Sequence, residues 1–243
     1  MKIIENFAAL FFPHRCVACG KVMENDGFCS GCAGRVARVS ALLPRGKYTD
    51  GLAAPFFYTG PVRQGLLNMK YYRRRDNTRY FGGEIAAAVR ALGLSCDGVC
   101  FVPMGAKSQK TRGFNQSERL AARVGEILGL PVLPAGLVKC RESRPQHQLS
   151  SAARRENISG CFAVWDDVRG RRILLIDDIK TTGATLEECA RILKTAGAAE
   201  VVGAVAAVNQ KTFLYSFGSW DIIMLKQMFR LEKFSAPSGG SFV

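Results

Sequence analysis

The feature that most constrains this chain is residues 170–197, GRRILLIDDIKTTGATLEECARILKTAG. Residues 173–176 form a short continuous run of Ile and Leu, which is typical of a strand buried on both faces. Asp177 and Asp178 follow where that strand should end. Apolar residues then recur at helical spacing until Gly197 ends the pattern. The sequence therefore predicts a strand, a tight polar loop and the N-terminus of a helix.

The predicted loop, residues 181–185, contains small hydroxyl side chains around one glycine. Such a loop directs backbone N–H groups at one point, and the helix dipole adds positive potential there. The residues that we expect to bind a phosphate are Thr181, Thr182, Gly183, Ala184 and Thr185. Because a phosphate would repel Asp177 and Asp178, we expect these carboxylates to face sugar hydroxyls or Mg²⁺. An ordinary strand–helix turn without a ligand is the alternative.

Strands and helices alternate between residues 98 and 208, which predicts a parallel α/β sheet. The runs 98–103 and 201–208 have the composition of buried strands, and 117–128 has an apolar helical face. Open α/β sheets bind ligands at the carboxyl ends of their strands. The basic segment 104–116, expected to be a flexible loop, follows one such end. Its candidates for a diphosphate with Mg²⁺ are Lys107, Lys110 and Arg112.

Four cysteines near the start are spaced as two Cys-x2-Cys pairs, Cys16 with Cys19 and Cys29 with Cys32. Each pair makes a tight knuckle that presents two thiolates to one metal, and two knuckles complete a tetrahedron. We therefore predict a structural Zn²⁺ held by these four residues, with no position left for zinc chemistry. Two disulfides are the alternative, and His14 is a possible competing ligand.

The chain has 243 residues and a net charge of +14, which favours polyanionic partners such as nucleic acid or an anionic membrane surface. Its start lacks the pattern of a signal peptide, and no segment approaches the apolar length of a transmembrane helix. Together with the grouped cysteines, this leads us to expect a reducing, cytoplasmic setting.

Residues 70–81, KYYRRRDNTRYF, interleave cations with aromatic rings. Cations suit phosphates and rings stack on bases, so this composition suits a single-stranded nucleic acid. The residues that we predict for this contact are Lys70, Tyr71, Tyr72, Arg73, Arg74 and Arg75. A solvated loop whose aromatic residues pack inward is the alternative.

We expect three regions. Residues 1–45 would form a helix and the zinc module, residues 50–212 the α/β domain, and residues 213–243 an amphipathic extension with a disordered end. The extension would cover the core, or dock on a partner or on the inner face of the membrane.

Residues 173–185 resemble the PRPP (5-phosphoribosyl-1-pyrophosphate) motif of type I phosphoribosyltransferases. The resemblance implies that Asp177 and Asp178 bind the ribose 2′- and 3′-hydroxyls while residues 181–185 hold the 5′-phosphate. The order of features along the chain is similar to the ComF (ComFC-type) family of natural-transformation loci. The matching positions are the four cysteines, residues 69–74, 102–104 and 112–116, and Arg141, Gln146, Leu149, Ser150, Arg154 and Asn157.

The ComF resemblance implies a cytoplasmic protein that binds single-stranded DNA during natural transformation, in contact with DNA-uptake proteins at the inner membrane surface, and that uses the PRPP-type site with Mg²⁺. An active phosphoribosyltransferase is the alternative. Substitution at the ribose anomeric carbon needs Mg²⁺ on the leaving diphosphate and negative charge near the ribose, which Asp177 and Asp178 would supply. No acceptor pocket for a base or an amine is identifiable from the residues.

Overall fold

The structure is a computed structural model that describes residues 14–39, 42–71, 75–134, 136–140 and 160–210. At residues 75, 76, 107, 108 and 112 the description extends to the backbone only. The helix expected at residues 1–12, the polar segment 141–159 and the C-terminal extension lie outside the described residues.

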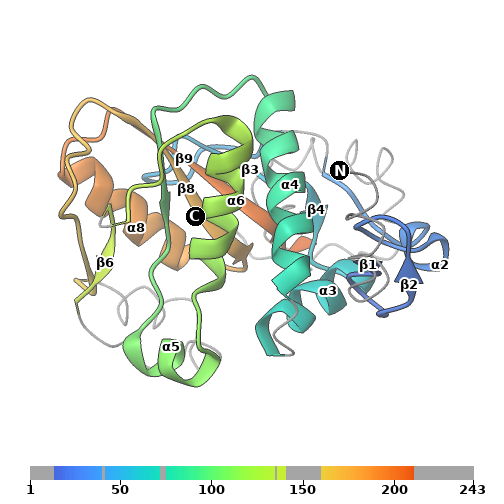
Figure 1. The fold of residues 1–243 in the computed structure, drawn as a ribbon. Helices are drawn as coiled ribbons and strands as arrows, with labels where there is room; N and C mark the ends of the chain where they lie inside the picture. Colours follow the sequence, from blue (N-terminus) through green and yellow to red (C-terminus); the bar gives the residue numbers. More distant parts are fainter. Residues whose placement is uncertain (1–13, 40–41, 72–74, 135, 141–159, 211–243) are drawn as a thin grey trace, which may run out of the picture.

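A five-stranded sheet forms the centre of the molecule (Figure 1). Its strands are β3 (Gly51–Ala53), β4 (Phe56–Phe57), β5 (Gly98–Phe101), β8 (Arg172–Lys180) and β9 (Glu200–Val208). The order is β3-β9-β8-β5, with β4 also paired to β9, and every pairing is parallel. The predicted parallel α/β sheet is thereby confirmed.

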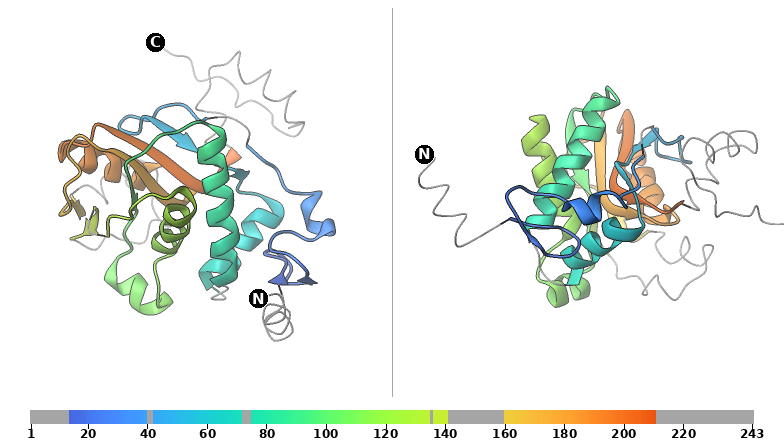
Figure 2. Two further views of the ribbon diagram at one scale, coloured as in Figure 1. Left: turned by 45° about the horizontal axis from the view of Figure 1, so that its top comes forward. Right: turned by 90° about the vertical axis from the view of Figure 1, so that its right-hand side faces the viewer.

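Helices cover both faces of this sheet. Helices α3 (Gly60–Tyr71), α4 (Arg75–Ala91) and α6 (Gln116–Leu128) pack on one face, and α8 (Ala184–Thr195) packs on the other (Figures 1 and 2). Because successive strand residues point to opposite faces, β8 supplies both cores. The Ile173 and Leu175 side chains join the cluster under α8, and those of Leu174 and Ile176 join the cluster under α3, α4 and α6. Continuous hydrophobicity in β8 reflects this two-sided burial.

Strand β8 is longer than the sequence indicates. It continues through Asp177 and Asp178 to Lys180, whereas we expected it to end before the acidic pair. The neighbouring strand β9 is equally long and pairs with this extension, with Asp177 opposite Val205 and Lys180 opposite Val208. Strand alternation therefore points the two carboxylates to opposite faces of the sheet.

Two other expectations differ from the structure. Segment 104–116 contains a short helix, α5 (Ala106–Arg112), because Gly105 and Gly113 end a run of helix-compatible residues and Gly113 takes a φ of 78°. The apolar composition of residues 131–138 also predicts a strand, but the structure contains only a single bridge between Val132 and Val99, followed by β6 (Val138–Lys139). Prolines at 131 and 134 cannot donate to a strand ladder.

The N-terminal module and a two-stranded sheet lie beside the main sheet. The module consists of β1 (His14–Arg15), β2 (Val22–Met23) and α2 (Ser30–Ala33), next to α3 and α4 (Figure 1 and Figure 2, right). Cys16 and Cys19 lie in the connection between β1 and β2, Cys29 is the N-cap of α2, and Cys32 lies within α2. Strand β6 pairs antiparallel with β7 (Phe162–Ala163). Among the helices that the structure describes, none is both long and apolar enough to cross a membrane.

Candidate functional site

A pocket of about 280 Å³ lies at the carboxyl end of β8. The sequence from Asp177 to Leu186 lines it continuously, so it contains the acidic pair, the whole polar loop and the first turn of α8. Three further residues, Tyr58, Lys70 and Val205, complete the lining from other parts of the chain. The structure thus brings together all seven of the predicted residues between 177 and 185.

The loop geometry depends on Gly183. This residue is the N-cap of α8 and has a φ of 79°, which side chains disfavour. A Cβ at this position would also lie 2.7 Å from Lys180 Cε, so the lysine chain lies directly against the loop. Gly183 makes no side-chain hydrogen bond that would cap the helix. Burial lowers the pKa of Lys180. The arrangement places helix N–H groups and a cation around one end of the pocket, as an anion requires.

Asp177 is fixed by two donors. Its Oδ1 accepts a hydrogen bond from Ser117 Oγ at 2.9 Å and from the Asp178 backbone N–H at 2.8 Å. Burial, followed by the nearby Asp178 charge, raises the pKa of Asp177 to about 7. Both effects favour the neutral acid, so Asp177 keeps its proton to a higher pH than an ordinary aspartate does.

Ser117 was not among the predicted site residues. It lies in the first turn of α6, where Asn115 is the N-cap and accepts from the Ser117 backbone N–H at 3.0 Å. The Asn115 side chain also donates to Val102 O at 3.1 Å, which ties the start of α6 to the end of β5. An Asn before an apolar-periodic helix is a readable start signal, but the 60 residues between Ser117 and Asp177 hide their contact.

Lys70 lies against the other carboxylate. Its Nζ is 2.6 Å from Asp178 Oδ2, and the two side chains are only 21% and 13% exposed. Lys70 is one of the residues predicted for a nucleic-acid contact, and the structure places its ammonium beside Asp178 in the pocket. Asp178 follows Ile176 on the face that packs under α3, and Lys70 lies near the end of that helix, which explains why they meet.

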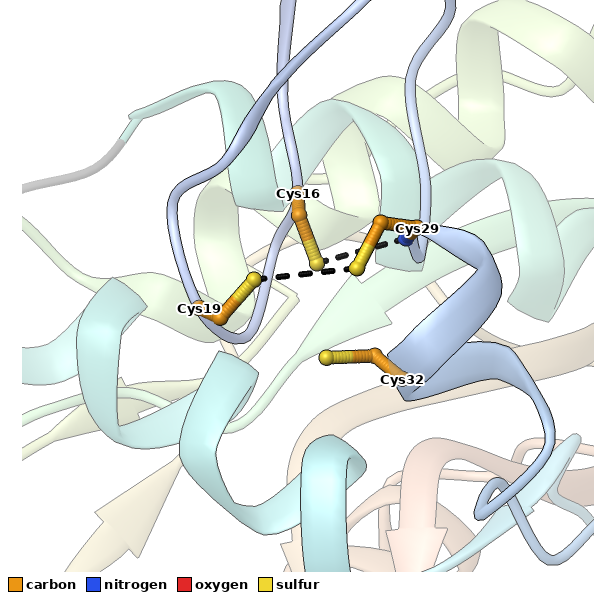
Figure 3. Close-up of side chains that lie close together, drawn as sticks. All are labelled: Cys16, Cys19, Cys29 and Cys32. Carbon is orange, nitrogen blue, oxygen red and sulfur yellow. Dashed lines mark hydrogen bonds between the residues drawn. The ribbon is translucent and has the colours of Figure 1, made fainter.

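The four cysteines form one cluster. The sulfur atoms of Cys16, Cys19, Cys29 and Cys32 all lie within 4.8 Å of one another and point inward (Figure 3). Cys19 Sγ and Cys29 Sγ are 3.7 Å apart, close to the ~3.8 Å that a tetrahedron with Zn–S distances of about 2.3 Å requires. That separation is far beyond the roughly 2.05 Å of a disulfide. His14 instead pairs with Asp26 at 2.6 Å. The cluster fits a metal ion such as zinc.

This cluster is attached to the helices beside the pocket. The Asn68 side chain of α3 donates to Val17 O at 3.0 Å and to Ala18 O at 2.8 Å, both inside the first Cys-x2-Cys knuckle. Asn77 of α4 donates to the same Val17 O at 2.9 Å and to Gly65 O at 2.8 Å. Both amides are buried, so these bonds are costly to lose.

Comparison with known proteins indicates a protein family for this chain. Residues 112–217 match the phosphoribosyl transferase domain family. The chain is 28% identical over 217 residues to DNA utilization protein YhgH of Salmonella typhi, covering 79% of this chain and 96% of that protein. It is 24% identical over 218 residues to competence protein F of Haemophilus influenzae, covering 79% and 95%. These matches support a ComF-type, phosphoribosyltransferase-like family for the chain.

A purine phosphoribosyltransferase of Pyrococcus horikoshii overlaps this structure with a TM-score of 0.33 at 20% identity, covering 53% of this chain and 70% of the other. The parallel sheet and the family match, not that overlap, identify the fold.

The structure describes the remaining predicted site residues only in part. Lys107 and Arg112 belong to α5, which follows β5, and only their backbone is described. Tyr71 ends α3 and is 64% exposed, while Arg75 begins α4. Residues 72–74 of the same stretch, Tyr72, Arg73 and Arg74, fall outside the described residues.

Two aromatic residues of the 70–81 stretch pack inward. The Tyr80 ring lies 5.4 Å from the Phe28 ring of the four-cysteine module and 5.5 Å from Phe81, centroid to centroid. The stretch is also mostly helical rather than a loop, because it spans the end of α3 and the start of α4. For Tyr80 and Phe81, the inward packing that we kept as an alternative is what the structure contains.

Proposed function

We propose that this protein binds PRPP with Mg²⁺ and single-stranded DNA, and that it supports DNA uptake in natural transformation. The observation that carries the proposal is the pocket at the end of β8, where the acidic pair and the polar loop lie within one cavity of about 280 Å³. The names of the two relatives, DNA utilization protein and competence protein F, favour the same role.

The chemistry of the pocket suits a phosphorylated sugar. The 5′-phosphate would lie on the loop at residues 181–185, where N–H groups of α8 and Lys180 offer positive potential. Ribose hydroxyls would donate to the carboxylates of Asp177 and Asp178. The diphosphate with Mg²⁺ would extend toward α5, which carries Lys107 and Arg112 at the carboxyl end of β5. In that arrangement Mg²⁺ would supply charge neutralisation of the leaving diphosphate.

A thermal-shift titration tests ligand binding. PRPP with Mg²⁺ should raise Tm in the wild type, because a ligand that binds only the folded state stabilises it. The shift should vanish in the double variant Asp177→Ala, Asp178→Ala. Asp97→Ala is the matched control, since Asp97 forms an ion pair with Arg172 at the opposite end of β8. Equal Tm shifts in the wild type and the double variant would refute the proposed site.

Single-strand binding is tested by fluorescence anisotropy with a labelled oligonucleotide. Affinity should fall steeply with salt, because cations that contact phosphates release counterions. Replacing Arg73, Arg74 and Arg75 with Ala should weaken binding and reduce the salt slope. A control that removes Lys21, Arg169 and Arg171, which lie in other parts of the sequence and are exposed or partly exposed, lowers the net charge equally. Equal losses in both variants would mean that total charge, not the predicted stretch, governs binding.

An active phosphoribosyltransferase is the second candidate. Asp178 gives negative charge in the pocket, which an oxocarbenium-like transition state needs, and Tyr58 offers a ring on which a planar acceptor could stack. Diphosphate release on addition of a panel of bases or amines would establish turnover, and its dependence on Asp178 would locate it.

Three further parts of the proposal concern the location of the protein, its partners and its functional regions. The protein would act in the cytoplasm, in contact with DNA-uptake proteins at the inner membrane surface. Residues 1–45, 50–212 and 213–243 would be its three functional regions. A deletion strain scored for transformation with chromosomal DNA tests the role, and complementation with a chain lacking residues 213–243 tests the last region.

A further inference from the structure

The acidic pair already has a cation beside it. Lys70 reaches Asp178 from α3, more than one hundred residues earlier in the chain, with Nζ and Oδ2 2.6 Å apart. Both side chains are largely removed from solvent and both line the pocket. An ion pair at the protein surface would be incidental, but one this enclosed has a defined position.

The helix that carries Lys70 is held firmly. Two residues before it, Asn68 makes two hydrogen bonds to the first cysteine knuckle, and Met69 and Leu66 are buried in the core. Asn77 ties the same knuckle to Gly65 of α3. Lys70 is therefore brought to Asp178 by a built contact between α3 and the four-cysteine module.

The charge balance of the pocket follows from this placement. Asp177 and Asp178 are adjacent carboxylates, and Asp177 shares its oxygen with the Ser117 hydroxyl. Lys70 compensates the charge of Asp178, while the other pocket lysine, Lys180, lies against the phosphate loop next to Gly183. Lys70 thus leaves the pair with at most one uncompensated carboxylate charge, which attracts a free divalent cation less strongly than two would, although carboxylate oxygens are ligands that Mg²⁺ and Mn²⁺ prefer.

We propose that Lys70 is the resident counter-cation of the acidic pair: it excludes a bare divalent cation and admits the metal only together with a phosphorylated sugar. The inference rests on the proposed function and adds to it a selectivity-determining residue. A polyanionic ligand brings its own negative charge, so the Lys70 ammonium can turn from Asp178 toward a phosphate oxygen. A free metal ion offers no such exchange and must compete with the ammonium directly.

Two binding measurements on the Lys70→Met variant test this proposal, and we expect the two affinities to change in opposite directions. Mn²⁺ alone, followed by electron paramagnetic resonance, should bind the variant about tenfold or more tightly than the wild type, because one opposite charge at this distance shifts an ionisation equilibrium by about 1–3 pKa units. PRPP with Mg²⁺, followed by calorimetry, should bind the variant more weakly by a similar factor. Lys70→Arg keeps the charge and should resemble the wild type in both.

Lys194→Met is the matched control. Lys194 Nζ lies 2.6 Å from Asp50 Oδ2 with comparable exposure, but this ion pair does not line the pocket. It should leave both Mn²⁺ and PRPP binding unchanged. If Lys70→Met proves poorly folded by circular dichroism, Lys70→Gln, which keeps a polar group at that position, gives the same comparison.

The outcomes separate the inference from the function on which it rests. Failure of the wild-type protein to bind PRPP would refute the proposed function. The Mn²⁺ measurement would still decide the role of Lys70. Wild-type protein that binds PRPP, with a Lys70→Met variant that gains no Mn²⁺ affinity, would overturn the inference. A uniform loss of affinity for both probes would also overturn it, because that result indicates a merely structural lysine.

Discussion

The four-cysteine module and the β8 pocket are built in opposite ways. All four sulfur ligands of the module come from residues 16–32, and their spacing alone predicts the cluster. The pocket takes Tyr58, Lys70 and Val205 from distant parts of the chain to complete the segment 177–186, and Ser117 of α6 donates to Asp177. A site whose residues are close in sequence can therefore be predicted from their spacing. The residues that a pocket takes from distant elements become apparent only in the folded structure.

The two regions nevertheless share one helix. Asn68 of α3 contacts the knuckle and Lys70 of the same helix contacts Asp178, so a change in the module reaches the pocket through two residues. If this connection matters, the two sites cannot be altered independently. The predictions below test that dependence, beginning with the largest expected effect.

Removing the metal should have the largest effect. Cys19→Ser, or treatment with a chelator, should abolish zinc content by atomic absorption and lower Tm strongly, since structural zinc stabilises small modules by roughly 10 kcal/mol or more. Because the module anchors α3, affinity for PRPP should fall as well. Cys140→Ser, at an exposed cysteine outside the cluster, should change neither quantity. Full PRPP affinity in the metal-free protein would show that module and pocket are independent.

Asn68→Ala should come next. The substitution leaves the Val17 and Ala18 carbonyls without these donors, which we expect to cost about 2–4 kcal/mol of unfolding free energy for two buried bonds. Urea denaturation measures this loss, and zinc retention measured in parallel reports whether the knuckle has loosened. Gln64→Ala removes only the bond that Gln64 donates to Asn68 Oδ1 and should cost much less. Similar losses in the two variants would contradict the clamp between α3 and the knuckle.

How far the sequence predicts this protein depends on the range of each interaction. The parallel sheet, α8 and the cysteine cluster follow from periodicity and spacing, which are local signals. The predicted end of β8 was wrong, because the extension of this strand depends on pairing with β9 rather than on its own residues. Ser117 and Lys70 were missed as partners of the acidic pair, because those contacts span 60 and more than one hundred residues. Long-range pairing carries no signal in a single sequence.

Gly183→Ala should have a smaller, local effect. The left-handed backbone costs an alanine about 1–2 kcal/mol, and the new methyl group would meet Lys180 Cε at 2.7 Å. Gly93→Ala is the matched control, because Gly93 has a φ of 62° but open space around its Cβ position. The difference in unfolding free energy between the two variants isolates the Lys180 contact. In addition, only Gly183→Ala should weaken binding of PRPP, and equal affinities in the two variants would separate the loop from the phosphate.

The smallest effect should be the pH dependence that Asp177 imposes. Its pKa rises from the ordinary 3.8 to about 7 in the folded chain, first through burial and then through the Asp178 charge. Between these values unfolding releases a proton, so the free energy of unfolding should fall as pH rises and level off above the folded pKa. Between pH 6 and pH 8 the loss should be about 1.4 kcal/mol, which corresponds to one pKa unit.

Asp177→Asn tests this assignment. The amide keeps an oxygen that can accept from Ser117 and has no proton to release, so the difference between wild type and variant removes every other titrating group from the comparison. The wild type should lose stability relative to the variant as pH rises from 6 to 8. If the two curves stay parallel across that interval, Asp177 is ionised throughout. In that case the acidic pair of the pocket carries two negative charges at neutral pH, and Lys70 alone cannot balance them.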